Sequence, residues 1–256
     1  MILAAATLWL RELIRFWRQP SRVIGALGSP FVFWLLIGSG IGTSFHGGNS
    51  PGARNYLEYF FPGTLLLVIF FTAVFSTISI IEDRREGFLQ SVLVAPVPEA
   101  SLVLGKVFGG TTLAFLQALF FLLLAPLIGL KLDVLVFMKT ASVLFLNGFL
   151  LTSLGFLIAW QFHSIQGFHA VMNLFLMPLW ILSGALFPAE GAAKWIRFIM
   201  KLNPLAYGLK AVRFALFGSP GPGDLLNSVI VTMLFASVFF IFASLSVAQP
   251  AHRRVG

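Results

Sequence analysis

The sequence holds 256 residues with a net charge of +8; 58 % of them are apolar, even before the 24 glycines are counted, and only 10 % are charged. Soluble domains carry roughly 45–50 % apolar and about 25 % charged residues, so this balance excludes a soluble enzyme, a disordered chain and a nucleic-acid-binding domain. The bilayer must therefore be the solvent for most of the chain, and the basic residues between apolar runs are interpreted as topology determinants and contacts to anionic lipid.

A membrane-spanning helix needs about 20 consecutive apolar residues, and six stretches of the chain meet that length. None of the six contains Asp, Glu, Lys or Arg, so all 17 basic and 9 acidic residues lie outside them. The sequence has no long linker and no repeat, and it is predicted to form one all-α transmembrane domain over residues 1–256. The predicted spans are 23–43, 62–81, 107–130, 140–161, 169–187 and 225–248.

Residues 8–22 are predicted to form an amphipathic helix that lies on the membrane surface before the first span. Tryptophans, leucines and phenylalanine share the face opposite a polar stripe, and Pro20 marks a turn. The functional interpretation is a lever that joins cytoplasmic parts to the first span, and the alternative is a plain basic flank. The candidate residues are Trp9 and Trp17 on the apolar face and Arg11, Arg15, Arg18 and Arg22, extended by Glu12, on the polar face.

The same arginines predict the orientation of the chain. Four arginines precede the first span and only Arg54 follows it, which places the N-terminus in the cytoplasm. Six crossings return the C-terminus, with Arg253 and Arg254, to that side. We therefore predict a multi-pass protein of a bacterial inner membrane with both termini cytoplasmic.

The stretch from residue 82 to residue 106 is predicted to be a cytoplasmic loop that docks on another protein. It begins with a mixed-charge cluster, continues as an apolar helix too short to span, and ends at Pro96 and Pro98. A solvated connector is the alternative, but connectors rarely expose so many apolar residues. The candidate docking residues are Glu82, Asp83, Arg84, Arg85, Glu86, Gly87, Phe88, Leu89, Val92, Leu93 and Pro96.

Residues 188–215 are too charged to span the membrane and are predicted to form two short amphipathic helices at its outer face, broken at Asn203-Pro204. A lipid-surface anchor is one interpretation of these helices. Polar groups that could line a translocation path, although interhelical hydrogen bonding is the commoner role, are Gln117, Asn147, Asn173, Ser183 and Tyr207.

The sequence offers no energy source of its own. Its Gly105-Lys106 pair is followed by Val107, and Ala100 stands where a phosphate-binding loop needs glycine, so no nucleotide site is predicted. The predicted spans lack the ionisable residues that proton-coupled carriers use. His163 and His169 are six residues apart, off one helical face, so no metal site is predicted either.

Three motifs, in order along the chain, resemble the membrane subunit of type-2 ABC exporters, a family that includes nodulation-factor, drug-efflux and polysaccharide-export permeases. The motifs are Glu82-Asp83-Arg84-Arg85-Glu86-Gly87, the run from Asn173 to Gly184 with Phe187-Pro188, and Leu202-Asn203-Pro204-Leu205-Ala206-Tyr207 with Arg213 beyond. The resemblance implies that loop 82–106 is a coupling helix seated in a separate ATPase subunit, which would hold the ATP and Mg. It also implies an assembly of two permeases and two ATPases, and an external re-entrant hairpin over residues 188–215 that dips partway into the membrane and lines the exit, where it could act as a gate.

These inferences predict a non-enzymatic permease subunit of an ATP-driven exporter, working as a homodimer. An apolar path rich in phenylalanine suits an amphipathic, lipid-linked or drug-like substrate. The alternative is a partner-free secondary carrier or channel, which would transport without an ATPase.

Overall fold

The computed structural model describes residues 1–41, 55–188, 191–218, 221 and 223–248, and all regular elements in that part of the chain are helical. Six helical stretches in it are long and apolar enough to cross a membrane, as predicted. The first four are single helices: α2 (Pro20–Ile41), α3 (Tyr56–Arg85), α5 (Glu99–Leu122) and α6 (Val134–Gln161). The fifth contains α7 (Ile165–Val171) and α8 (Met177–Trp180), and the sixth is α11 (Asp224–Ala248).

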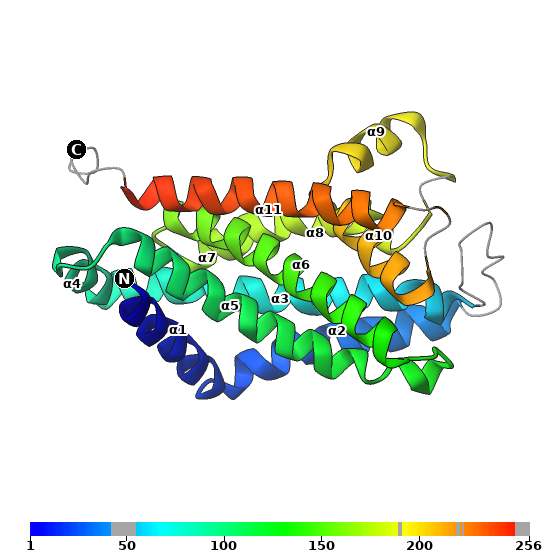
Figure 1. The fold of residues 1–256 in the computed structure, drawn as a ribbon, viewed down its shortest axis with the longest axis horizontal. Helices are drawn as coiled ribbons and strands as arrows, with labels where there is room; N and C mark the ends of the chain where they lie inside the picture. Colours follow the sequence, from blue (N-terminus) through cyan, green and yellow to red (C-terminus); the bar gives the residue numbers. More distant parts are fainter. Residues whose placement is uncertain (42–54, 189–190, 219–220, 222, 249–256) are drawn as a thin grey trace.

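Helix α3 is the centre of the bundle. Within the most apolar part of α3, 89 % of the residues are buried, against 22 % in α2, the fifth span and α11. It packs against α2, α5 and α6. Helix α11 packs mainly on α6, on the side of the bundle opposite α2 (Figure 1). One protomer therefore leaves three of its six spans largely open to lipid or to other chains.

Several helices are longer than the predicted spans, because the apolar stretch sets only the part that must sit in hydrocarbon. Helix α3 begins six residues before the predicted span and continues through Arg85, and α5 begins eight residues early, at Glu99. Its predicted end at 130 is too late: α5 stops at Leu122, followed by a 3₁₀ turn at Ala125–Ile128. The extended ends carry charges into the helical bundle.

The first helix, α1 (Ile2–Trp17), starts and ends about five residues earlier than the predicted 8–22. Pro20 is the first residue of α2, where its missing N–H costs nothing. Helix α1 lies along α5, with Leu8 and Phe16 buried. A Cβ at Gly105 would lie 2.5 Å from the Leu8 Cβ, so glycine permits this close approach.

The fifth span is not a continuous α-helix. Two π-helical segments, Met172–Leu176 and Ile181–Ala185, flank α8, and Gly184 has a φ of 94° that side-chain-bearing residues rarely adopt. The predicted 169–187 helix is therefore broken near its end. After it come α9 (Lys194–Leu202) and α10 (Pro204–Phe217), which meet at Asn203-Pro204 as predicted.

The two ends of the bundle carry different elements. Helix α1 starts at the same end as α4 (Phe88–Val94), and α11 finishes there, whereas α9 lies at the opposite end (Figure 1). Loop 82–106 is thus on the side of the N-terminus. Arg54, Arg253 and Arg254 fall outside the described residues.

Candidate functional site

A buried cluster of ion pairs joins α1, α3 and α5 at the end of the bundle that carries α4. The Lys106 ammonium donates to Asp83, to the Glu12 carboxylate at 2.7 Å and to the Ser79 hydroxyl at 3.0 Å. The side chains of these three charged residues are at most 4 % exposed. Three helices that are distant in sequence therefore meet on one lysine.

Arginines of α1 complete this cluster from the other side. Arg11 donates two hydrogen bonds to Asp83, at 2.9 and 2.6 Å, and Arg15 donates one at 2.5 Å. The hydrogen bond to Asp83 raises the pKa of Arg11, so its guanidinium stays charged. Asp83 thus accepts from three cations at once.

The outer part of the cluster reaches α2 and the start of the loop. Arg15 pairs with Glu82 at 2.9 Å and Glu86 at 3.3 Å, and Arg22 of α2 pairs with Glu82. The cluster holds equal numbers of acids and bases: Glu12, Glu82, Asp83 and Glu86 against Arg11, Arg15, Arg22 and Lys106. Because each buried charge has partners, the desolvation penalty is offset.

This cluster corrects one expectation from the sequence and adds buried charges that the predicted spans do not include. Glu12 was expected on the headgroup face of the first helix, but it turns inward to Lys106, because Gly105 and Gly109 let α1 approach α5 closely. The predicted spans themselves hold no Asp, Glu, Lys or Arg, but Glu12, Asp83 and Lys106 are buried where the helices extend beyond those spans. The predicted spans stop short of these residues, so no span count could reveal them.

Helix α4 is anchored at its first turn and exposed at its last. Gly87, with a φ of 76°, makes the sharp turn out of α3 that starts α4. The Arg11 guanidinium lies 3.7 Å from the Phe88 ring centroid, and Leu89 is buried. Leu93 and Val94, in contrast, are 43 % and 84 % exposed. The helix thus presents an apolar tip from a fixed base.

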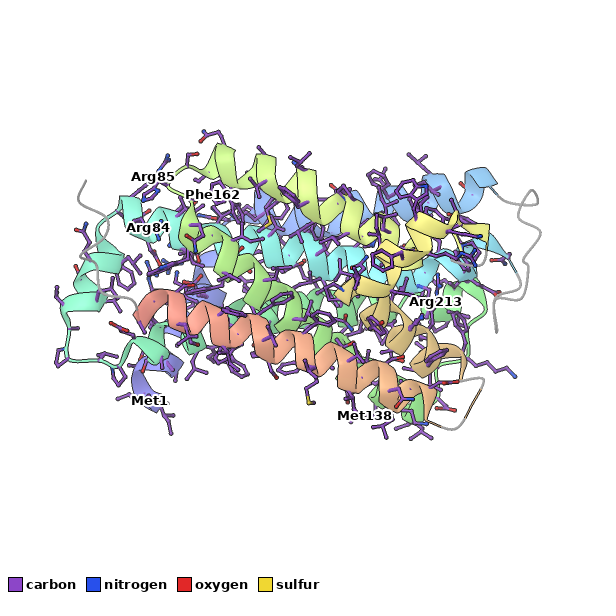
Figure 2. All side chains as sticks on the ribbon, turned by 90° about the horizontal axis from the view of Figure 1, so that it is seen from above. Met1, Arg84, Arg85, Met138, Phe162 and Arg213 are labelled. Atoms are coloured by element: carbon purple, nitrogen blue, oxygen red, sulfur yellow. The ribbon has the colours of Figure 1, made fainter. Side chains whose placement is uncertain are left out.

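Two further arginines tie the end of α3 to the end of α6. Arg84 donates to the carbonyls of Phe162 at 2.7 Å and Trp160 at 2.8 Å, and Arg85 donates to that of His163 at 3.2 Å. Figure 2 shows Arg84, Arg85 and Phe162 together at this end of the bundle. The base of α4 is therefore connected to α1, α5 and α6.

Comparison with known proteins identifies the class to which this arrangement belongs. Residues 4–217 match the family described as ABC-2 type transporter, a stretch that runs from α1 to the end of α10. The chain belongs to the ABC-2 type transporter family. It is therefore a multi-pass membrane protein of a family whose permeases work with an ABC ATPase, as the motifs of the sequence indicated.

Curated relatives of this ABC-2 family member bear permease and nodulation names. The chain is 30 % identical over 209 residues to the putative transport permease ycf38 of Cyanophora paradoxa, covering 80 % of this chain and 71 % of that protein. It is 24 % identical over 249 residues to Nodulation protein J of Neorhizobium galegae, covering 93 % and 90 % of the two chains. The permease names support a non-catalytic transmembrane subunit.

In this ABC-2 family member the predicted docking residues divide into two groups. Asp83, Arg84 and Leu89 face inward and hold the loop on the bundle. Leu93 and Pro96 are exposed and free to meet another protein. The predicted interfacial residues divide similarly: Arg11 and Arg15 bind carboxylates, the Trp9 indole donates to Thr112 at 3.0 Å, and Trp17 and Arg18 stay exposed.

The structure does not bring the five predicted path residues together. Gln117 accepts a hydrogen bond from Thr72, Asn147 donates to the Val143 carbonyl, and Ser183 donates to that of Trp180. These three are buried within the protomer; the bond to Gln117 joins α3 to α5, whereas these bonds of Asn147 and Ser183 lie within their own helical segments. Tyr207 donates to the Lys201 carbonyl, and Asn173 is exposed on the fifth span. A path role for any of them remains a prediction.

Residues around Gly184 form a second cluster, at the α9 end, that sequence reasoning missed. The Gly184 carbonyl accepts from the Tyr59 hydroxyl at 2.9 Å and from Arg213 at 2.8 Å. The Arg213 guanidinium also lies 4.3 Å from the Tyr59 ring centroid, and the Trp180 indole donates to the Gly63 carbonyl at 2.9 Å. The Gly184 carbonyl belongs to a π-helical turn, and no periodicity of apolar residues signals such turns.

Proposed function

We propose that this chain is the permease subunit of an ATP-driven exporter, with α4 as the helix that an ATPase subunit pushes. The observation that carries the proposal is the construction of α4: an exposed apolar tip at Leu93 and Val94 on a base fixed by Arg11 and Leu89. Such a tip fits a groove in a partner. In this proposal the whole chain acts as one transmembrane domain in a bacterial inner membrane, with α4 and both termini in the cytoplasm.

The buried cluster offers a route for the force. A push on α4 reaches Asp83 through the single turn at Gly87, and Asp83 is bound to α1 and α5. Because paired charges in a low-dielectric site resist separation, these helices move together rather than slide. Closure of two ATPase subunits would then tilt α1, α3 and α5 as a unit.

Replacing Leu93 by aspartate tests the docking role of α4. Association with the ATPase subunit should weaken by about 30-fold or more, because a charge would replace an apolar anchor at the centre of the contact. The measurement is the vanadate-sensitive ATPase activity that co-purifies with the affinity-tagged chain, together with ATP-driven transport in vesicles. Folding should be unaffected because Leu93 is exposed.

The matched control is Val134→Asp, which makes the same kind of change on an exposed residue at the other end of the bundle. It should leave co-purification unchanged, since an aspartate at the start of α6 is compatible with the helix dipole. Equal co-purification for both variants would refute the docking role. Transport by the purified chain alone, driven by an ion gradient, would instead support the partner-free carrier.

We infer that two copies of this permease pair through the face formed by α2 and the fifth span. Both elements flank Phe75 of α3: a Cβ at Gly25 of α2 would lie 3.6 Å from the Phe75 ring, and the His169 ring of α7 lies 6.1 Å from it. The face exposes Leu36 of α2 and Leu174 of the fifth span. In lipid, apolar exposure alone does not drive helices together. Small and polar groups beside the face, such as Asn173, do favour contact between helices.

Disulfide cross-linking can test this pairing directly, because the sequence contains no cysteine. Leu174→Cys should form a covalent dimer in oxidised native membranes, with at least half of the chain cross-linked. Leu234→Cys on the exposed face of α11 should stay monomeric and serves as the control. Cross-linking of Leu234→Cys alone would move the interface to the other side of the bundle.

The cargo class follows from the apolar character of the exposed spans. We propose an amphipathic, lipid-linked or drug-like molecule, taken from the cytoplasm or the inner leaflet and moved outward between the two copies. Stimulation of the co-purified ATPase by a panel of amphiphiles, set against hydrophilic sugars of similar mass, tests this class. A response to the sugars alone would exclude it.

A further inference from the structure

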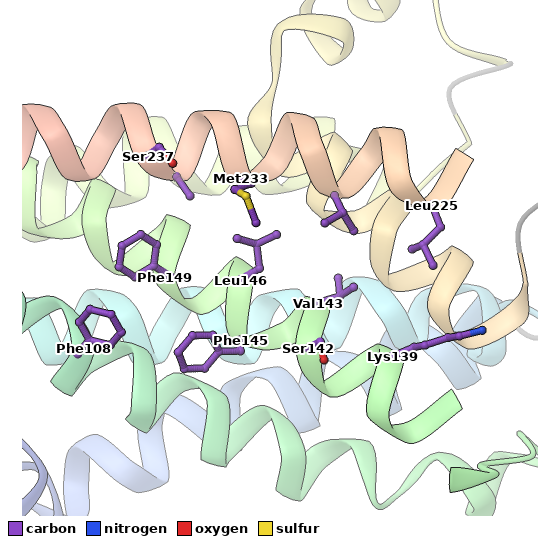
Figure 3. Close-up of a pocket in the computed structure, with 12 residues that line it drawn as sticks. Phe108, Lys139, Ser142, Val143, Phe145, Leu146, Phe149, Leu225, Met233 and Ser237 are labelled. Carbon is purple, nitrogen blue, oxygen red and sulfur yellow. The ribbon is translucent and has the colours of Figure 1, made fainter. Parts of the chain in front are cut away.

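An apolar groove on the outside of the bundle is separate from the charged cluster and from the proposed dimer face. It lies along α6, with α11 on one side and α5 on the other, and its volume is about 620 Å³. This volume is within the roughly 300–1,000 Å³ of ordinary ligand sites. Figure 3 shows the groove opening between α6 and α11.

The groove has a closed end and an open end. Phe108 of α5 and Phe149 of α6 line the closed end, with their ring centroids 5.5 Å apart, and Phe149 in turn lies 5.3 Å from the Phe240 ring of α11, centroid to centroid. Lys139 of α6 and Leu225, the second residue of α11, line the other end (Figure 3). The groove thus runs from a group of aromatic rings on the side of the bundle to a basic residue at the end opposite α4.

The length of the groove matches one leaflet of a bilayer. From Lys139 to Phe149 there are ten residues of helix, or about 15 Å at the α-helical rise. Half of a hydrocarbon core is also about 15 Å. The walls between these ends are apolar, with Val229 and Met233 on α11 facing Leu146 on α6. An acyl chain laid along the groove would therefore place its headgroup at the level of Lys139.

Lys139 supplies the chemistry that selects the headgroup. It is exposed, and within the described part of the chain it makes no ion pair; the nearby Asp133 is occupied as the cap of α6, accepting from the Val136 N–H at 2.7 Å. A lysine on a flexible stem that lines an apolar groove extends its ammonium toward the interface. There it attracts phosphate-bearing lipids.

We propose that this groove is a binding site for one acyl chain of an anionic phospholipid, with its phosphate at Lys139. The ligand lies in the leaflet opposite the α4 end of the protein. Its acyl chain fills the space between α6 and α11. Phe145 and Met233 border this space, and they are 37 % and 55 % exposed. The proposal does not depend on the export function.

Native mass spectrometry of the full-length protein, delipidated and titrated with phosphatidylglycerol or phosphatidylcholine, tests the site. The wild type should bind the first phosphatidylglycerol more tightly than phosphatidylcholine. Lys139→Gln should lower the affinity for phosphatidylglycerol about fivefold and leave that for phosphatidylcholine unchanged. Lys131→Gln removes a lysine at the same end but outside the groove and should change neither.

A second variant tests the acyl-chain part of the site. Val229→Trp fills the groove from the α11 side and should reduce the binding of both phosphatidylglycerol and phosphatidylcholine. At other lipid sites on the protein, the preference for phosphatidylglycerol should stay unchanged. Equal effects of Lys139→Gln and Lys131→Gln would overturn the headgroup assignment. Full lipid binding by folded Val229→Trp, or a disulfide between two copies of Met233→Cys, would overturn the assignment of a lipid to the groove.

Discussion

Replacing Asp83 by asparagine is expected to lower the free energy of unfolding by about 3–5 kcal/mol, the largest effect of any single change outside the apolar core. The carboxylate is fully buried and accepts hydrogen bonds from Arg11, Arg15 and Lys106. Asparagine is nearly the same size, so packing is preserved. The cost comes from three partly or wholly buried cations that lose their shared counter-charge.

The measurement is the loss of folded protein on titration with SDS in mixed micelles, followed by fluorescence. Glu86→Gln is the matched control: it removes a carboxylate from the same cluster, but the Glu86 side chain is 60 % exposed and pairs with Arg15 at 3.3 Å. Exposed pairs contribute about 0–1 kcal/mol, so little change is expected. Similar losses for the two variants would show that burial does not govern this cluster.

The same cluster predicts non-additivity. Lys106→Met leaves Glu12 buried without its main partner, whereas the double change with Glu12→Gln removes both charges of that pair. The double variant should therefore be more stable than the sum of the two single losses predicts. This comparison separates a pairwise interaction from general damage to the bundle.

Replacing Gly105 by alanine is expected to destabilise the protein by about 1–3 kcal/mol, even though alanine favours a helix over glycine by about 1 kcal/mol. The new Cβ would lie 2.5 Å from the Leu8 Cβ and 2.9 Å from the Ala5 carbonyl oxygen. Since one of these neighbours is backbone, α1 must move away from α5 as a whole. That movement also lengthens the distance from Glu12 to Lys106.

Gly40→Ala in α2 is the control, because a Cβ there would meet nothing within 4 Å. Helix propensity alone should make that variant neutral or slightly more stable. Thermal inactivation in detergent, read as the monodisperse fraction on size-exclusion chromatography, compares the two. A stabilised Gly105→Ala would mean that α1 is not held against α5 as described.

The predictions for Asp83→Asn and Gly105→Ala both depend on the contacts that hold α1 against α3 and α5. The sequence predicted that this helix lies on the membrane surface. Instead, its Arg11 and Arg15 bind Asp83 of α3, and its Glu12 binds Lys106 of α5. Detaching it should therefore affect transport as well as folding. The exposed face of α1, with Leu10, Ile14 and Trp17, still suits contact with lipid.

The sequence by itself determined the number of spans, the short helix after the second span, the helix break at Asn203-Pro204 and the family. Each depends on local chemistry: the length of an apolar run, the position of glycine and proline, and motifs read in order along the chain. That Gly105 and Gly109 let α1 approach α5 closely is visible only in the structure.

Only the tertiary structure decided where the charges go. Asp83 and Lys106 are 23 residues apart and Glu12 is 94 residues from Lys106, so no pattern within one helix could pair them. The π-helical turns near Gly184 and the groove between α6 and α11 likewise depend on contacts between segments that are distant in the sequence. In a bilayer, apolar length fixes which segments cross, but charge pairing and close packing between distant segments fix which faces meet, because lipid offers buried polar groups no other partner.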